Sequence, residues 1–171
     1  MPELAVAVLG PDRPGVIAAL SEVVLAEHGN LLDASMTILR GQFAMTLVVD
    51  VPVDADHVLA DLGPVAERLG LLVSVRAVGA TEQGPATSPY VVHVHGADRP
   101  GIVHRITGTL ASYGANVTDL TTRLAEGLYV LVAEIAVPAS VDVTALQADV
   151  AAAVADLGVT ATVQPADSDV L

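Results

Sequence analysis

The chain contains no cysteine and no tryptophan, and only four of its 171 residues are aromatic. The lack of cysteine excludes disulfides, thiolate metal sites, thiol nucleophiles and redox sensing. Three tyrosines and one phenylalanine offer few surfaces on which nucleic-acid bases can stack. A folded core must therefore be built from Val, Leu, Ile and Ala, which suits compact α/β packing.

Positive charge is also scarce. Seven Lys and Arg residues stand against 20 Asp and Glu residues, which gives a formal net charge of -13. An acidic surface repels the phosphates that a nucleic-acid-binding protein has to neutralise. The composition therefore predicts no direct contact with nucleic acid.

Long hydrophobic runs are missing as well. No segment approaches the roughly 18 consecutive apolar residues of a membrane helix. The sequence begins MPELAVAVLGPDRPG, in which no basic segment precedes the apolar stretch and a Gly-Pro break follows it, unlike a signal peptide. We therefore expect a cytoplasmic protein without a membrane partner.

The sequence repeats itself after a shift of 86 residues. Residues 4–52 align with 90–138 without a gap and share twelve identities in 49 positions, among them the run DRPG at 12–15 and 98–101. That run contains no Ala, Val or Leu, so the bias of the composition does not explain the match. Two copies of one unit are therefore predicted.

The stretch between the copies is rich in Gly, Pro, Ser and Thr and has no apolar periodicity, as in a linker. The predicted organisation is a first module at 1–78, a linker at 79–89, a second module at 90–164 and a flexible tail at 165–171.

Both copies carry the same order of local patterns. β-rich or alternating runs predict strands at 4–9, 31–39, 43–51 and 71–78, and at 90–95, 117–124, 129–137 and 159–164. Apolar residues at i, i+4 and i+8, such as Val16, Leu20 and Val24, predict a helix after each DRPG run, and a second helix precedes each last strand. The order β-α-β-β-α-β predicts a ferredoxin-like α+β fold, with an antiparallel four-stranded sheet and both helices on one face.

The first predicted strand is apolar on both faces. Val6 and Val8 alternate with Ala7 and Leu9, so the face without helices is expected to be covered by the other copy or by a second chain. We therefore expect self-association, with a homodimer as the simplest form.

The loops GPDRPG and GADRPG each join the first strand of a copy to its first helix. Asp12 or Asp98 suits the N-cap of the helix, Pro14 or Pro100 suits its first turn, and Gly15 or Gly101 allows a close approach to the backbone. The free amides and the positive end of the helix dipole would accept a small carboxylate there. Two structural alternatives stay open: the loop serves only to start the helix, and Arg13 or Arg99 only pairs with its neighbouring aspartate.

The run G-x-D-R-P-G, followed by GNLLD at 29–33 or GANVTD at 114–119, resembles the ACT domain. Two copies without an enzyme resemble the tandem ACT proteins of the glycine cleavage system transcriptional repressor group. The resemblance implies that a small effector such as an amino acid binds at an interface between modules or subunits. The residues that it implicates are Asp12, Arg13, Gly15, Asn30, Asp98, Arg99, Gly101 and Asn116.

An Asn side chain suits such an effector, because its amide both donates and accepts hydrogen bonds. The structural alternative is that Asn30 and Asn116 simply begin a strand after a tight turn. Asp33 and Asp119 occupy matching places in the second strand and are expected to be solvated charges at its edge.

Three histidines of the second copy are candidate metal ligands. His93 and His95 are predicted to share one face of a strand, and His104 lies in the helix that follows. Their counterparts in the first copy are all apolar, so no metal site is expected; a polar contact of His95 with a ligand or partner is the better use. No nucleophile has a base nearby in sequence, and neither an enzymatic activity nor a cofactor is expected.

The function predicted from the sequence is that of a non-catalytic regulator. It senses a small effector and acts through a partner protein, because its acidic surface argues against direct action on DNA. Two alternatives stay open: an ACT-based assembly module without a metabolite, and a detached regulatory subunit of a metabolic enzyme.

Overall fold

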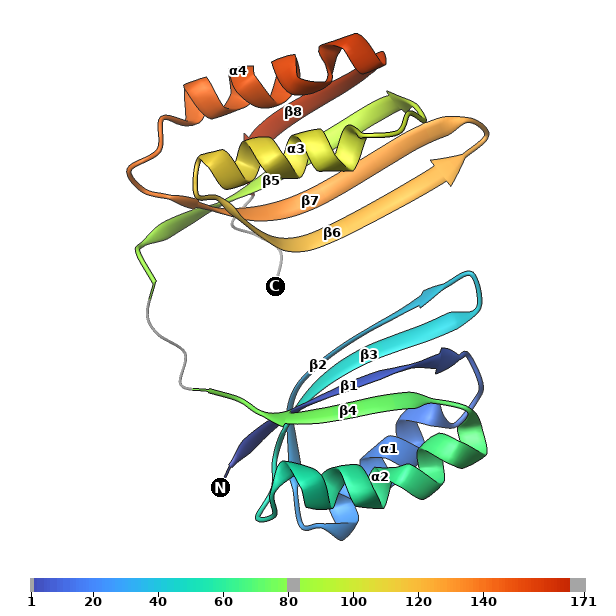
Figure 1. Cartoon of the computed structure of the whole chain (residues 1–171). Coiled ribbons are helices and arrows are strands. Elements are labelled where there is room, and N and C mark those ends of the chain that lie inside the picture. The colour runs from blue at the N-terminus through green and yellow to red at the C-terminus, as the bar shows by residue number, and fades with distance from the viewer. Residues whose placement is uncertain (1, 80–83, 167–171) are drawn as a thin grey trace. The chain divides into compact units, whose positions relative to one another are not determined.

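The computed structural model describes residues 2–79 and 84–166. They form two compact units, one on each side of residues 80–83 (Figure 1). Each unit has its own sheet, its own pair of long helices and its own hydrophobic core. The predicted α+β fold with two ferredoxin-like modules is confirmed.

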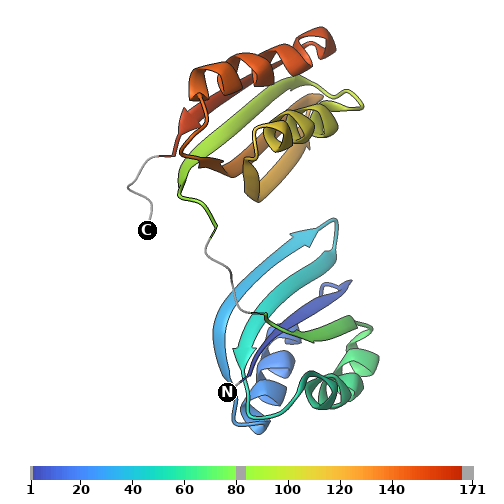
Figure 2. The ribbon, with the colours of Figure 1, turned by 60° about the vertical axis from the view of Figure 1, so that its left-hand side comes forward.

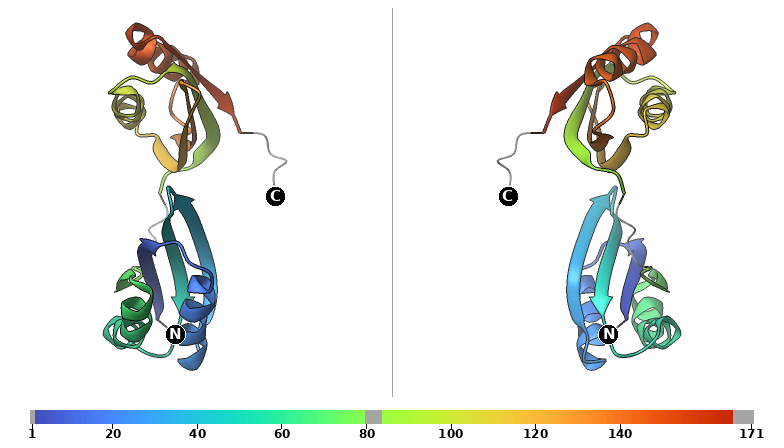
Figure 3. Two further views of the ribbon diagram at one scale, coloured as in Figure 1. Left: turned by 90° about the vertical axis from the view of Figure 1, so that its right-hand side faces the viewer. Right: turned by 90° about the vertical axis from the view of Figure 1, so that its left-hand side faces the viewer.

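The first unit has the predicted order of elements. They are β1 (Glu3–Pro11), α1 (Val16–Ala26), β2 (Asn30–Leu39), β3 (Gln42–Asp50), α2 (Ala55–Leu69) and β4 (Leu72–Ala77). The strands form an antiparallel sheet in the order β2-β3-β1-β4. Both helices cover the same face of this sheet, as Figures 2 and 3 show from further sides.

The second unit repeats this arrangement. Its elements are β5 (Thr87–Ala97), α3 (Ile102–Ser112), β6 (Asn116–Ala125), β7 (Leu128–Pro138), α4 (Val143–Val154), a short 3-10 helix (Ala155–Leu157) and β8 (Val159–Pro165). The sheet order is β6-β7-β5-β8. Because β5 begins at Thr87, the last three residues of the predicted linker 79–89 are strand. Residues 80–83 of that linker and 167–171 of the predicted tail lie outside the described residues.

The cores lie between each sheet and its helices. In the first unit, α1 buries Val16, Leu20 and Val24 on one face, at the spacing of successive helical turns. The alternating residues Val6 and Val8 of β1 pack against them. The second unit places Ile102, Ile106 and Leu110 in the same way.

Two-residue turns connect the second and third strands of each unit. Arg40 and Gly41 both have positive φ angles of 51° and 78°, and Glu126 and Gly127 have 51° and 83°. Two successive positive φ angles define a type I′ turn, whose twist matches that of the strands it joins. The second and third strands of each unit therefore form a hairpin.

The second strand of the first unit, β2, is not covered by the helices. Every residue of β2 is exposed. Leu31, Met36 and Ile38 pair with the buried residues of β3 and so face the helix side of the sheet, yet each is more than 40% exposed. The free edge of the first sheet is therefore apolar.

Candidate functional site

The DRPG loop of the first unit leads from β1 into α1. The backbone N–H of Asp12 donates a hydrogen bond of 2.9 Å to the carbonyl of Gly41, which holds the loop against the β2-β3 turn. Asp12 and Arg13 themselves are exposed. The loop is therefore anchored by its backbone, and its charged side chains are available to solvent.

The prediction that Asp12 and Asp98 cap the helices is wrong. The N-cap residues are Gly15 and Gly101, with left-handed φ angles of 90° and 96°, and no side chain caps either helix. Pro14 accordingly precedes α1 instead of occupying its first turn. With three residues between Asp12 and the first helical residue, its carboxylate is not the cap of α1.

The helix starts are consequently open to an anion. Neither α1 nor α3 has an acidic residue in its first turn, so the partial positive charge of the helix end is not compensated there. A Cβ added at Gly15 or Gly101 would meet nothing within 4 Å. These glycines serve the positive φ, and the space beside them is free.

Arg13 and Arg99 add an exposed positive charge to each loop. Both are exposed, and in the described residues neither forms an ion pair. The alternative that each arginine is neutralised by its neighbouring aspartate is therefore not observed. A free guanidinium beside an uncapped helix start suits a carboxylate, which it contacts through two N–H groups.

The structure does not bring the two asparagines to the loops of their own units. Asn30 is the first residue of β2, whereas the DRPG loop lies at the other end of that strand, beside the β2-β3 turn. Ten residues of strand span about 30 Å. Asn116 begins β6 in the same way. One module alone therefore does not combine its loop and its asparagine in one site.

A small cavity lies beside Asn30. It has a volume of about 90 Å³ and is lined by Ser21, Val24, Leu25, Gly29, Leu31 and Leu47. Its lining is mainly apolar, and its size corresponds to roughly three water molecules. The cavity thus has room only for a small group, and Asn30 itself is not among the residues that line it.

Asp33 and Asp119 lie exposed in β2 and β6. The strand register shifts between Leu31 and Asp33, and the side chain of Asp33 accepts a hydrogen bond of 2.8 Å from the N–H of Ala34. A carboxylate that is satisfied locally at a β-bulge agrees with the prediction of a solvated charge at the edge.

Tyr129, in β7 of the second unit, carries a hydroxyl that is influenced by the charge of Asp98 in the second DRPG loop. Burial raises the pKa of Tyr129, the charge of Asp98 raises it further, and a hydrogen bond with Thr122 lowers it. The buried Phe43 occupies the matching position in the first unit. The two loops therefore differ in polarity, and this difference was visible in the repeat alignment.

The three candidate histidines do not converge. His93 and His95 are exposed on the sheet face opposite the helices, because the alternate residues Val92 and Val94 are buried beneath the helices. His104 belongs to α3, in the helix layer. The sheet thus separates His104 from the other two.

No helix in the described residues is both long and apolar enough to cross a membrane.

Two ferredoxin-like units with an open loop at the start of the first helix define the class of the protein: a tandem of small α+β modules. A family model described as ACT domain matches residues 3–76 and 88–164. The chain belongs to the ACT domain family and consists of two tandem copies.

Known relatives agree with this assignment. A UPF0237 protein of Pyrobaculum aerophilum is 38% identical over 77 residues, which cover 43% of this chain and 86% of that protein. The glycine cleavage system transcriptional repressor of Escherichia coli K12 is 24% identical over 121 residues, which cover 70% of this chain and 64% of the repressor. The chain is thus similar to a single-module and to a regulatory relative.

A solved structure shares the fold over nearly the whole length. The crystal structure of an unknown protein from Galdieria sulphuraria superposes on this chain with a TM-score of 0.82 and 25% sequence identity. The match covers 96% of this chain and 98% of that protein. The two-unit architecture is therefore shared with a known protein.

Proposed function

We propose that the protein is a non-catalytic regulator that binds a small amino acid and acts through a partner protein. One observation carries the proposal. Each module presents an unpaired arginine beside a helix start that no side chain caps. The family assignment and the similarity to a transcriptional repressor of glycine cleavage support the same function.

We place the effector between two copies of the chain. Asn30 and the DRPG loop lie at opposite ends of β2, and β2 is an edge strand with exposed apolar side chains. If two β2 edges pair in antiparallel fashion, the start of one strand meets the end of the other. Asn30 of one copy then lies at the DRPG loop of its partner copy, and β6 offers the same arrangement for Asn116.

The chemistry of such a composite site fits an amino acid. The carboxylate meets Arg13 and the free amides at the start of α1. The ammonium meets Asp12 and the side-chain oxygen of Asn30. The small cavity beside Asn30 favours effectors with small side chains, so glycine and serine are the first to test.

A regulatory effect would pass through a protein partner. The net charge of -13 opposes contact with DNA. An effector that binds only the paired form shifts the association equilibrium and changes the surface that a partner meets. We propose transcriptional control of amino-acid metabolism as the setting, on the similarity to the glycine cleavage repressor.

Calorimetric titration with glycine, serine and other amino acids tests the proposal. The wild-type chain should release heat for at least one small amino acid, and Asn30→Ala together with Asn116→Ala should abolish that heat. Ser74→Ala is a matched control, because Ser74 is exposed on β4, at the opposite edge of the sheet. Unchanged binding in the double Asn variant would refute the proposed site.

A second function is favoured by the apolar edge itself. Leu31, Met36 and Ile38 are exposed on β2, as in a strand that is covered by a partner. An assembly module that binds no metabolite would use the same edge. A stable dimer that gives no heat with any amino acid would identify this second function.

A further inference from the structure

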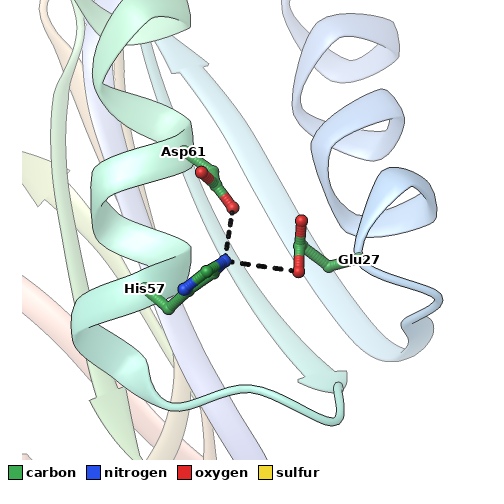
Figure 4. A group of neighbouring side chains, drawn as sticks. All are labelled: Glu27, His57 and Asp61. Carbon is green, nitrogen blue, oxygen red and sulfur yellow. Dashed lines mark ion pairs between the residues drawn. The ribbon is translucent and has the colours of Figure 1, made fainter.

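Three side chains of the first unit come from two different helical segments and lie close together. Glu27 directly follows α1 as its C-cap residue. His57 and Asp61 lie one turn apart on α2 (Figure 4). Asp54 caps α2, and its Oδ1 accepts a hydrogen bond of 2.9 Å from the N–H of His57. This hydrogen bond fixes the backbone of the first turn of α2, which carries His57.

Two of the distances within this group match the spacing of metal ligands. Nε2 of His57 lies 3.5 Å from Oε2 of Glu27 and 3.4 Å from Oδ2 of Asp61, and the three ligand atoms lie within 4.8 Å of one another. Hydrogen bonds of this kind measure about 2.7–3.2 Å. Ligands at about 2.0–2.1 Å from a tetrahedral Zn²⁺ are roughly 3.4 Å apart.

The buried oxygen of Asp61 supports this interpretation. Its Oδ2 is shielded from solvent and has no hydrogen-bond partner among the described residues. A buried carboxylate oxygen without a hydrogen bond is costly unless a cation lies beside it. One imidazole nitrogen and two carboxylate oxygens are ligands that Zn²⁺ accepts.

The second unit provides an internal comparison. At the shift of 86 residues Tyr113 stands in place of Glu27. The second copy has two extra residues after Pro138, so beyond that point Ala145 stands in place of His57 and Asp149 in place of Asp61. The hydroxyl of Tyr113 donates a hydrogen bond of 2.6 Å to Oδ2 of Asp149. A neutral donor therefore joins the helices of the second unit, whereas the first unit brings two carboxylates together, which require a positive charge between them.

We propose that Glu27, His57 and Asp61 bind a divalent transition-metal ion of the zinc type, with water in the remaining position. His57 is more than half exposed, so the ion enters directly from solvent. Bound there, it links the end of α1 to the start of α2 and stabilises the first unit. The site is separate from the DRPG loops and does not depend on the proposed effector.

Titration of the untagged full-length chain with zinc chloride at about pH 7.5, where an ordinary histidine is neutral, tests the proposal. We expect calorimetry to show one Zn²⁺ per chain at this site and a higher unfolding temperature. His57→Ala should weaken this binding by about tenfold or more. A His93→Ala, His95→Ala double variant is the matched control. It should keep both the Zn²⁺ binding and the higher unfolding temperature, because those two histidines lie on β5 of the second unit.

A second variant separates loss of the ion from loss of the fold. Glu27→Tyr with His57→Ala copies the hydrogen-bonded pair of the second unit, so it should stay folded and bind no Zn²⁺ at this place. Unchanged Zn²⁺ binding in either His57 variant would overturn the proposal. The absence of heat and of stabilisation in the wild-type chain would also overturn it.

Discussion

The hydroxyl of Tyr113, at the end of α3, donates a hydrogen bond of 2.6 Å to Oδ2 of Asp149 on α4. This hydrogen bond is the largest cause that raises the pKa of Tyr113, followed by burial and by the charges of Asp149 and Asp142. The two helices of the second unit are thus linked by a contact that depends on the protonated phenol.

Tyr113→Phe should therefore lower the free energy of unfolding at neutral pH. Because the pKa of Tyr113 is raised in the folded state, the contact is fully present below the ordinary pKa of tyrosine, near about 10, and is lost as the pH rises through the folded value. Urea unfolding of wild type and variant at neutral and alkaline pH checks this. Equal stability of the two chains at neutral pH would contradict it.

Arg105 and Asp156 should have the opposite pH dependence. The Arg105 guanidinium donates a hydrogen bond to the Asp156 carboxylate and lowers its pKa. The stabilisation is therefore present above the ordinary pKa of aspartate and disappears as the pH falls through the folded value. Arg105→Gln should be less stable than wild type at neutral pH. The difference should shrink in strong acid, where only the hydrogen bond of Arg105 to the carbonyl of Ala153 is left. Urea midpoints across the acid range measure the difference, and a constant gap would speak against this pair.

Gly101→Ala should destabilise the second unit by about 1–2 kcal/mol, since Gly101 has a φ of 96° and L residues are strained there. Gly108→Ala in the same helix is the matched control. It also has open space around an added Cβ, but no positive φ, so it should stabilise by about 0.5–1 kcal/mol. Denaturant unfolding measures both, and the same sign for the two variants would refute the account.

The apolar edge of β2 predicts a site of self-association. Ile38→Lys should weaken it without unfolding the chain, because Ile38 is 48% exposed and its loss leaves the core intact. Leu72→Lys on β4 is the control, since Leu72 is even more exposed but lies at the opposite edge of the sheet. Sedimentation equilibrium would reveal the effect, and equal association of both variants would exclude the β2 edge.

The architecture could be predicted from the sequence because apolar residues recur at regular spacing and the whole unit occurs twice. Val16, Leu20 and Val24 recur at helical spacing and are buried as predicted, and the repeat of DRPG located the same loop in both units. The start of the helix was placed wrongly because several residues before it suit a cap. The positive φ of Gly15, which decides the position, depends on how the chain leaves β1.

The candidate site was predictable only in part. The sequence grouped the DRPG loop with Asn30, but the direction of β2 separates them by the length of a strand. The cluster of Glu27, His57 and Asp61 escaped notice because thirty residues separate Glu27 from His57 in the sequence and only helix packing unites them. The second copy lacks the same three residues, so the comparison of the two copies did not point to this cluster either.

Complementation between two defective chains tests the proposed composite site most directly. All chains carry Asn116→Ala to silence the second module, and one carries Arg13→Ala while the other carries Asn30→Ala. The account predicts that neither chain alone binds the amino acid, whereas a mixed dimer regains one site per dimer in calorimetry. Mixed dimers that bind no more amino acid than either parent would contradict a site shared between two copies.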